Sequence, residues 1–141
     1  MTRKPDWQEL LHAFIDSKQT AAFTWNANDC ALFAADAVLT MTGDDLGADY
    51  RGKYTDEAGA TAAIASNTGI ENGTVEDVAN KTGLEPVTNP LFLQRGDVAL
   101  YEGAEGKALG IVALNGIHAL FMGQSGLHKI PIRRCLKGWR V

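Results

Sequence analysis

A nearly uniform apolar segment, residues 31–41, places the strongest constraint on how this chain can fold. Only Asp36 and Thr40 interrupt the segment, so a helix formed here must be buried on most of its sides. Either Asn28 or Asp29 can cap the N-terminus of such a helix. We therefore expect the rest of the chain to be arranged around one central, buried helix.

Cys30 falls in the first turn of this expected helix. A helix N-terminus carries partial positive charge and unpaired N–H groups, which favour a thiolate and lower the pKa of the thiol. This is the setting of a cysteine nucleophile. A single cysteine in an apolar segment is also commonly a small buried hydrophobe. The two interpretations differ in whether the chain supplies Cys30 with a base.

Helical patterns fill the N-terminal half of the chain. Asp6 and Glu9 have the spacing of a capping box, and apolar residues follow at helical intervals. Gly43 and Gly83 stand where helices should stop. The predicted helices cover residues 6–17, 30–42, 56–66 and 75–82. Residues 50–54, Tyr-Arg-Gly-Lys-Tyr, are interpreted as an ordered loop with two aromatic anchors.

Strand patterns fill the rest of the chain, from residue 84 onward. Asn115-Gly116 between two apolar runs is a strong signal for a β-hairpin. The predicted strands cover residues 97–101, 109–114, 117–122 and 127–132, with a last edge strand at 138–141. Helices followed by an antiparallel meander define an α+β fold. We expect a single domain that spans residues 1–141, with helices in residues 1–83 and the sheet in residues 84–141.

The charge pattern excludes some classes of partner. The formal charge is −4 and no dense Lys/Arg cluster occurs, which argues against a nucleic-acid-binding surface. Basic residues near the end are expected to be solvated around the last strand: Lys129, Arg133, Arg134, Lys137 and Arg140. No run approaches the roughly 18 apolar residues of a membrane helix, and the start does not have the pattern of a signal peptide. We expect synthesis in the cytosol and no membrane insertion.

The cysteines and histidines are scattered along the chain. Cys30 and Cys135 could pair, but a disulfide is unusual in a reducing compartment and would consume the candidate nucleophile. His12, His118 and His128 do not have the short spacings of a metal site. We therefore expect no disulfide, no metal and no cofactor.

Several motifs occur in an order that resembles the NlpC/P60 family of papain-like cysteine hydrolases. They are Phe23-Thr-Trp25, Asp29-Cys30-Ala31, Arg95-Gly-Asp-Val-Ala-Leu-Tyr101, Ala108-Leu-Gly-Ile111 and Ile117-His-Ala119. The last three resemble the family's Pro-Gly-Asp, His-Val-Gly-Ile and Val/Ile-His-Ala strands. The resemblance covers roughly residues 23–132 and implies a Cys-bearing central helix packed on an antiparallel sheet.

The resemblance also assigns catalytic positions, and two of the four are changed. Cys30 matches the nucleophile and His118 matches the residue that orients the base. The base itself falls on Ala108, which cannot accept a proton. Phe23 matches the tyrosine that helps to bind the oxyanion, and loss of one such donor costs about 2.7 to 4 kcal/mol of transition-state stabilisation. The resemblance therefore implies a degenerate cysteine hydrolase site.

The whole sequence is similar to small NlpC/P60-like proteins of tailed phages and prophages. The resemblance implies a virion component of the tail tip, made in the host cytoplasm, that contacts other tail-tip or hub proteins during tail assembly. The changed catalytic positions argue against enzymatic activity.

Two other functions stay open at this point. One is an active peptidoglycan endopeptidase or amidase with Cys30 as nucleophile and His118 as substitute base. The other is a cytosolic module that binds a peptide or small ligand. Paired carboxylates for glycan cleavage, Asp29 and Asp36, are a weaker interpretation, because the first has a role as a helix cap and the second as the polar break of a buried helix.

Overall fold

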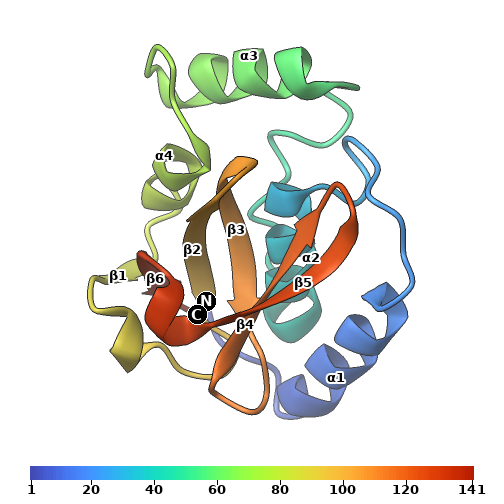
Figure 1. Ribbon diagram of the computed structural model, residues 1–141, viewed down its shortest axis with the longest axis vertical. Helices are drawn as coiled ribbons and strands as arrows, with labels where there is room; N and C mark the ends of the chain where they lie inside the picture. Colours follow the sequence, from blue (N-terminus) through green and yellow to red (C-terminus); the bar gives the residue numbers. More distant parts are fainter.

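The chain forms a layer of helices packed on a six-stranded antiparallel sheet (Figure 1). The computed structural model describes residues 1–141. The helices are α1 (Trp7–Lys18), α2 (Cys30–Thr42), α3 (Glu57–Thr68) and α4 (Val75–Asn80), with short 3-10 helices η1 (Pro90–Phe92) and η2 (Ile132–Arg134). The strands are β1 (Glu85–Val87), β2 (Val98–Gly103), β3 (Gly106–Val112), β4 (His118–Gly123), β5 (Gly126–Pro131) and β6 (Lys137–Arg140). The predicted α+β fold is confirmed.

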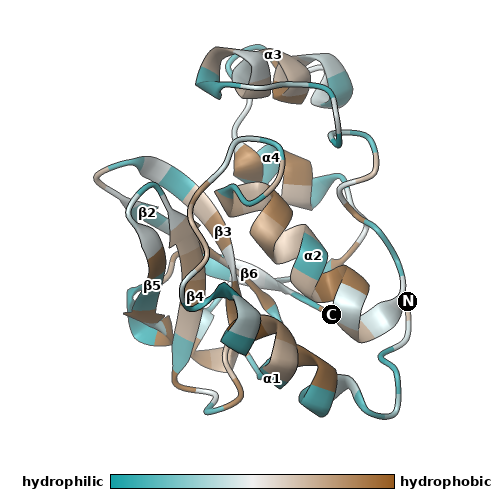
Figure 2. Ribbon diagram, turned by 90° about the vertical axis from the view of Figure 1, so that its right-hand side faces the viewer, coloured by the Kyte–Doolittle hydropathy of each residue, from teal (hydrophilic) through white to brown (hydrophobic).

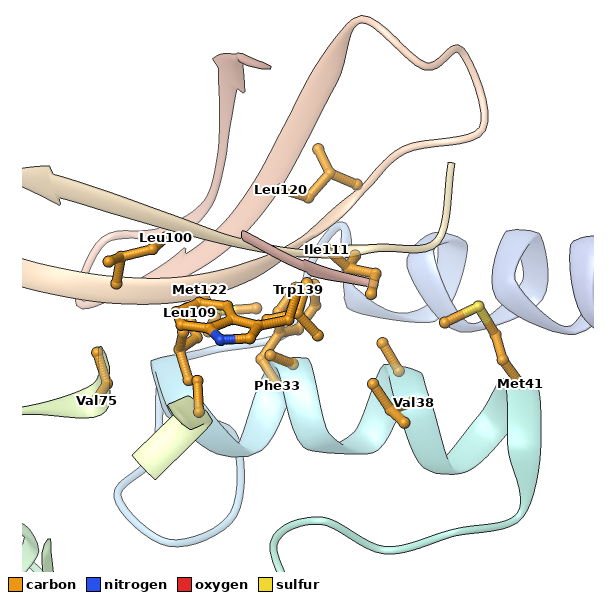
Figure 3. Close-up of a cluster of buried hydrophobic side chains, with 14 of the residues drawn as sticks. Phe33, Val38, Met41, Val75, Leu100, Leu109, Ile111, Leu120, Met122 and Trp139 are labelled. Atoms are coloured by element: carbon orange, nitrogen blue, oxygen red, sulfur yellow. The ribbon is translucent and has the colours of Figure 1, made fainter. Parts of the chain in front are cut away.

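Helix α2 is the buried centre of the molecule, as its sequence predicts. Phe33, Val38 and Met41 are fully buried and pack against the sheet (Figure 3). Asp29 is the N-cap, since its Oδ1 accepts a hydrogen bond from the Leu32 N–H at 2.9 Å. Gly43, with φ of +86°, ends the helix. The choice between Asn28 and Asp29 is thus resolved in favour of Asp29.

The sheet presents a different apolar cluster on each face, as the alternation of strand side chains requires. The face toward α2 carries Leu100, Leu109, Ile111, Leu120, Met122 and Trp139. The other face carries Ala99, Val112, Ala119 and Phe121, which pack with Val87, Leu93 and Cys135. Helix α2 contacts β3 most extensively and β4 next. The position of Cys30 is therefore set by the packing of α2 on β3.

Helix α3 lies at the edge of this core, against which its partly buried Ile64 packs. None of its residues is buried, and Figure 2 shows it set off from α2, with α4 on its inner side. Asp56 caps it through the Gly59 N–H at 2.7 Å, and Gly69 ends it. None of the helices, α3 included, combines the length and apolarity needed to cross a bilayer.

Two local details differ from expectation. The Asp6 side chain makes no capping hydrogen bond at α1, because its backbone (φ −100°, ψ 24°) is not in the extended conformation of an N-cap.

The β3–β4 connection is longer than a two-residue turn. Ala113 accepts from the Gly116 N–H at 3.0 Å, and of the Asn115-Gly116 pair only Gly116 has positive φ. The hairpin itself is formed as predicted.

The last strand is not an edge strand, which corrects the prediction for residues 138–141. Strand β6 lies between β2 and β1, with Val98 opposite Trp139 and Pro86 also opposite Trp139 on the other side. The sheet order is β1-β6-β2-β3-β4-β5. Strand β1 has only three residues, one of them proline, and so lacks the length and pattern by which a strand is recognised.

Asp97 joins the two ends of the chain to the sheet. Its carboxylate is fully buried and forms ion pairs with Arg3 at 3.4 Å and Arg140 at 3.2 Å. It also accepts hydrogen bonds from the backbone N–H groups of Gln94 (2.8 Å) and Val141 (3.2 Å). The Arg95-Gly-Asp97 motif therefore serves as a structural clamp at the entry to β2.

Candidate active site

Asp29 organises the loop that leads into the Cys30 helix. Besides capping α2, its Oδ2 accepts a hydrogen bond from the Asn26 N–H at 3.0 Å and one from the Tyr54 hydroxyl at 2.5 Å. The carboxylate is 1% exposed. All of these donors are fixed by the fold, so Asp29 has a structural role rather than one in acid–base chemistry.

The loop of residues 44–54 is tied to α2 by a second set of contacts. Arg51 donates to Asp36 at 2.7 Å and to Asp45 at 2.8 Å. The Asn26 side-chain amide donates to the Tyr50 carbonyl at 2.8 Å. The one carboxylate in the apolar segment, Asp36, is thus neutralised by Arg51. Neither carboxylate of the glycan-cleavage interpretation is free for that chemistry.

The thiol of Cys30 lies at the first turn of α2 and is partly buried. Burial is the main cause that raises its pKa to about 11, and the negative charge of Asp29 adds to the rise. Backbone N–H groups, among them those of Leu109 and Ala31, act in the opposite direction but are outweighed. The expected lowering of the pKa by the helix N-terminus is therefore wrong. Desolvation and an adjacent carboxylate overcome the effect of the helix.

Two cavities meet at Cys30. The larger, which we call the helical cavity, has a volume of about 450 Å³ and lies between α2, α3, α4 and the strands β2 and β3. The smaller, which we call the sheet cavity, has a volume of about 310 Å³ and lies over the β2–β3 and β4–β5 hairpins. Both are lined by Trp25, Cys30, Glu57, Glu105, Gly106 and Lys107. Cys30 thus lies at the junction of an extended, mostly apolar cleft.

Three of the four site residues expected from sequence line the sheet cavity together: Phe23, Cys30 and Ala108. Phe23 packs edge-on against Trp25, with ring centroids 4.9 Å apart, and offers no hydroxyl donor. Ala108 lies on β3 next to Leu109, whose backbone is near the thiol. The side chain at this position is a methyl group.

His118 is not part of the cleft. Its carbonyl accepts a hydrogen bond from the Ala113 N–H at 2.8 Å, so it lies beside residue 113, five residues along β3 from Ala108. At about 3.3 Å per residue this is roughly 17 Å along the strand. Its Nδ1 lies 3.1 Å from the Asn115 side-chain amide, and its backbone N–H also donates to Asn115. The ring therefore belongs to the β3–β4 turn.

His128 also lines the sheet cavity, a placement that the sequence does not predict. It is exposed, and it lies on β5 opposite Phe121 of β4. Strand β5 is two strands from β3, or roughly 10 Å in the sheet. The Nε2 atom lies 2.9 Å from the Ser125 hydroxyl. Only the register of the β4–β5 hairpin, which single-residue patterns do not fix, places His128 on this side.

A family model described as "Domain of unknown function (DUF6950)" matches residues 2–141. The chain belongs to this family. Among solved structures, this DUF6950 chain is similar to the NlpC/p60 domain of the peptidoglycan hydrolase SagA, with a TM-score of 0.58 and 14% identity over 95% of this chain and 98% of that one. The similarity shows a shared NlpC/P60 fold. No curated protein matches the sequence.

The DUF6950 chain has no cluster of three His, Cys, Asp or Glu side chains arranged to hold a metal ion. His12 is exposed on α1, far in sequence from the other two histidines. Cys30 and Cys135 are both free thiols, the latter buried in the second apolar cluster. The groups that line the cleft are therefore a protonated thiol, exposed carboxylates, the Lys107 ammonium, the exposed His128 imidazole and apolar walls.

Proposed function

We propose that this DUF6950 chain is a tail-tip component of a bacteriophage that uses an NlpC/P60-like fold for assembly rather than for hydrolysis. The proposal combines the shared fold with the sequence resemblance to small proteins of tailed phages and prophages. The chain is then made in the host cytoplasm and incorporated into the virion. Its partners are other tail-tip or hub proteins.

The chemistry around Cys30 supports a non-hydrolytic role. Cysteine hydrolases need a base that forms the thiolate and then protonates the leaving group. Here the pKa of Cys30 is raised to about 11 by burial and by Asp29, so the thiol is protonated near neutral pH. Ala108 and Phe23, which line the same cavity, provide neither a base nor a hydroxyl donor.

The register of β3 and β4 is the observation that carries this proposal. Ile111 pairs with Leu120, and the same register, continued along the strands, sets Gly123 opposite Ala108. Ala108 and Gly123, which carry no titratable group, thus face each other at the end of the β3–β4 pair that borders the sheet cavity, while His118 lies at the other end of the hairpin. This arrangement argues against a Cys30/His118 pair.

Hydrolysis of peptidoglycan stem peptides is the second candidate, and one observation favours it. His128 lines the same cavity as Cys30 and is the one imidazole that does so. A substrate-induced movement of the β4–β5 hairpin would be needed to bring the two groups together. The activity would then depend on both residues.

Purified protein incubated with muropeptides decides between these candidates. We expect no cleavage product by liquid chromatography and mass spectrometry over a range of pH. Cleavage that disappears in Cys30→Ala would overturn the non-hydrolytic proposal. Loss of that cleavage in His128→Ala, but not in His12→Ala, would identify the base.

The tail-tip assignment is tested separately, in particles. Mass spectrometry of virions purified from an induced lysogen that carries this gene should find the protein in the particle. Immunogold labelling should place it at the tip of the tail. A protein that is abundant in the lysate but missing from purified virions would instead support the stand-alone binding module.

A further inference from the structure

An exposed apolar surface flanked by arginines lies beside the β1–β6 edge of the sheet. Leu91 and Phe92 of η1 are 62% and 67% exposed, and Leu136 is 47% exposed. Helix η2, with the exposed Arg133 and Arg134, contacts η1. We call these five residues the arginine patch. Such large apolar side chains gathered at one exposed place indicate an interaction surface.

The arginines of this patch have no partner within the chain. Neither Arg133 nor Arg134 forms an ion pair, whereas nearby Arg140 is held by Asp97 and by the Phe92 carbonyl. In a chain of net charge −4, this leaves two free guanidinium groups next to exposed aromatic and aliphatic side chains. Arginine and phenylalanine are enriched in protein interfaces. The patch therefore fits an apolar surface that carries negative charge.

The helical cavity is apolar with negative charge at its rim, and so complements the arginine patch. Its walls are mostly apolar, and three exposed carboxylates lie along its rim: Glu57, Glu102 and Glu105. None of the three forms an ion pair. Lys107, the one cation at the rim, is neutralised by Glu76 at 2.9 Å. We call the helical cavity together with these three rim carboxylates the acidic cleft.

We propose that the arginine patch of one copy docks into the acidic cleft of a second copy. None of the patch residues lines either cavity, so a molecule can use both surfaces at once. Leu91 and Phe92 enter the apolar cavity beside α3, while Arg133 and Arg134 meet the rim carboxylates. Opposite charges around an apolar centre give both attraction and specificity.

Charge excludes the symmetric alternatives. Patch against patch brings four unpaired arginines together, and cleft against cleft brings six unpaired carboxylates together. Like charges face each other in both arrangements, which is unfavourable. Contact between the patch of one copy and the cleft of another is therefore the complementary mode. It closes as a two-fold dimer where both contacts form between the same two copies, and otherwise generates a ring or a filament. The inference rests on the proposed assembly role, for which it supplies a mode of self-association.

Sedimentation velocity over a wide range of concentration tests the mode of contact. The wild-type mass should rise with concentration and should fall again in high salt, because the contact is partly ionic. Phe92→Ser with Arg134→Ala removes the patch, and Glu57→Lys with Glu105→Lys removes the cleft. Each double variant should weaken association by about tenfold or more.

A mixture of the two double variants is the decisive measurement. One protein retains an intact cleft and the other an intact patch, so the mixture should form a 1:1 dimer that grows no further. An interface of patch against patch or of cleft against cleft predicts no such rescue. The matched control, Asp16→Lys with Asp44→Lys, changes the same charge at exposed sites outside both surfaces and should associate like the wild type.

Two outcomes overturn the inference: a wild-type chain that stays monomeric at every concentration, or a mixture that stays monomeric although circular dichroism shows both variants folded. A monomeric chain found in virions would refute head-to-tail contact and leave the tail-tip assignment standing. A self-associating chain missing from virions would do the reverse. The two proposals thus fail independently.

Discussion

Asp29 fixes the backbone around Cys30 and at the same time lowers the reactivity of the Cys30 thiol. The carboxylate caps α2, holds the preceding turn through the Asn26 N–H and accepts from Tyr54. The same negative charge, next to a buried thiol, disfavours a thiolate. No cation and no base is among the groups that shift the pKa of Cys30, so the arrangement keeps the thiol protonated.

The pH dependence of alkylation should report this directly. In a Cys135→Ser background, the rate of iodoacetamide labelling of Cys30 should rise about tenfold per pH unit up to the thiol pKa of about 11, with no plateau near neutral pH. Asp29→Asn removes one cause of the raised pKa and should move the profile to lower pH. Mass spectrometry measures the rates. A plateau near pH 7 would show an activated thiolate.

Two aspartates that cap helices offer a matched comparison of stability. Asp29 is buried and accepts from Leu32, Asn26 and Tyr54, whereas Asp56 is exposed and accepts from the Gly59 N–H. Asp29→Ala should lower the free energy of unfolding by about 3 kcal/mol, because buried donors lose their acceptor. Asp56→Ala should cost about 1 kcal/mol. Urea denaturation measures both, and equal losses would contradict the central role of Asp29.

At the scale of elements, β3 and β4 leave no room for a side chain at Gly110. A Cβ atom added there would lie 2.2 Å from the Leu120 carbonyl oxygen and 2.6 Å from the Phe121 ring. The glycine in Ala108-Leu-Gly-Ile111 is thus needed for strand packing, independently of any catalytic residue. The motif can persist in a chain that has lost the base.

Gly110→Ala should therefore disrupt the sheet. The clash involves backbone, so the two strands must move apart, and we expect a loss of about 3 kcal/mol or failure to fold. Gly83→Ala is the control: its φ of +83° strains an alanine, but nothing lies within 4 Å of the added atom. The control should cost about 1 kcal/mol. Thermal unfolding followed by circular dichroism compares them, and similar melting temperatures would refute the packing argument.

Sequence patterns predicted the elements well wherever the information is local. The apolar run of α2, the presence of a cap at Asn28 or Asp29 and the strand alternation follow from neighbouring residues. The place of β6 between β1 and β2 does not, because it depends on pairing with residues 85–87, far away in sequence. Pairing between strands that are far apart in the chain is the feature of a fold that is hardest to predict from a single sequence.

The difference between local and non-local information also explains which site residues the sequence places correctly. Phe23, Cys30 and Ala108 were matched by motif and do line one cavity. His118 was matched by the letters Ile-His-Ala, yet the length of the β3–β4 connection places it beside Ala113. The position of Cys30 at a helix N-terminus predicts a lowered pKa, but burial raises it. Burial depends on the packing of segments that are far apart in the sequence.

At the scale of the whole molecule, Asp97 links both chain ends to the sheet. Asp97→Ala would leave Arg3 and Arg140 without their buried partner and the Val141 N–H without an acceptor. We expect a loss of about 3 to 5 kcal/mol in the free energy of unfolding. Arg3→Ala and Arg140→Ala, at partly exposed side chains, should each cost less than Asp97→Ala. Chemical denaturation of the three variants gives this order, and an equal effect of all three would contradict it.

Because the two ends lie close together, the chain can be opened at an exposed loop instead of at its termini. Arg3 donates to the Val141 carbonyl at 3.2 Å, and the two termini overlap in the view of Figure 1. A short linker could join them, and the chain could be reopened at the β2–β3 hairpin as a circular permutant. For the same reason the whole unit can be grafted into a loop of another protein, since it enters and leaves its host at a single point.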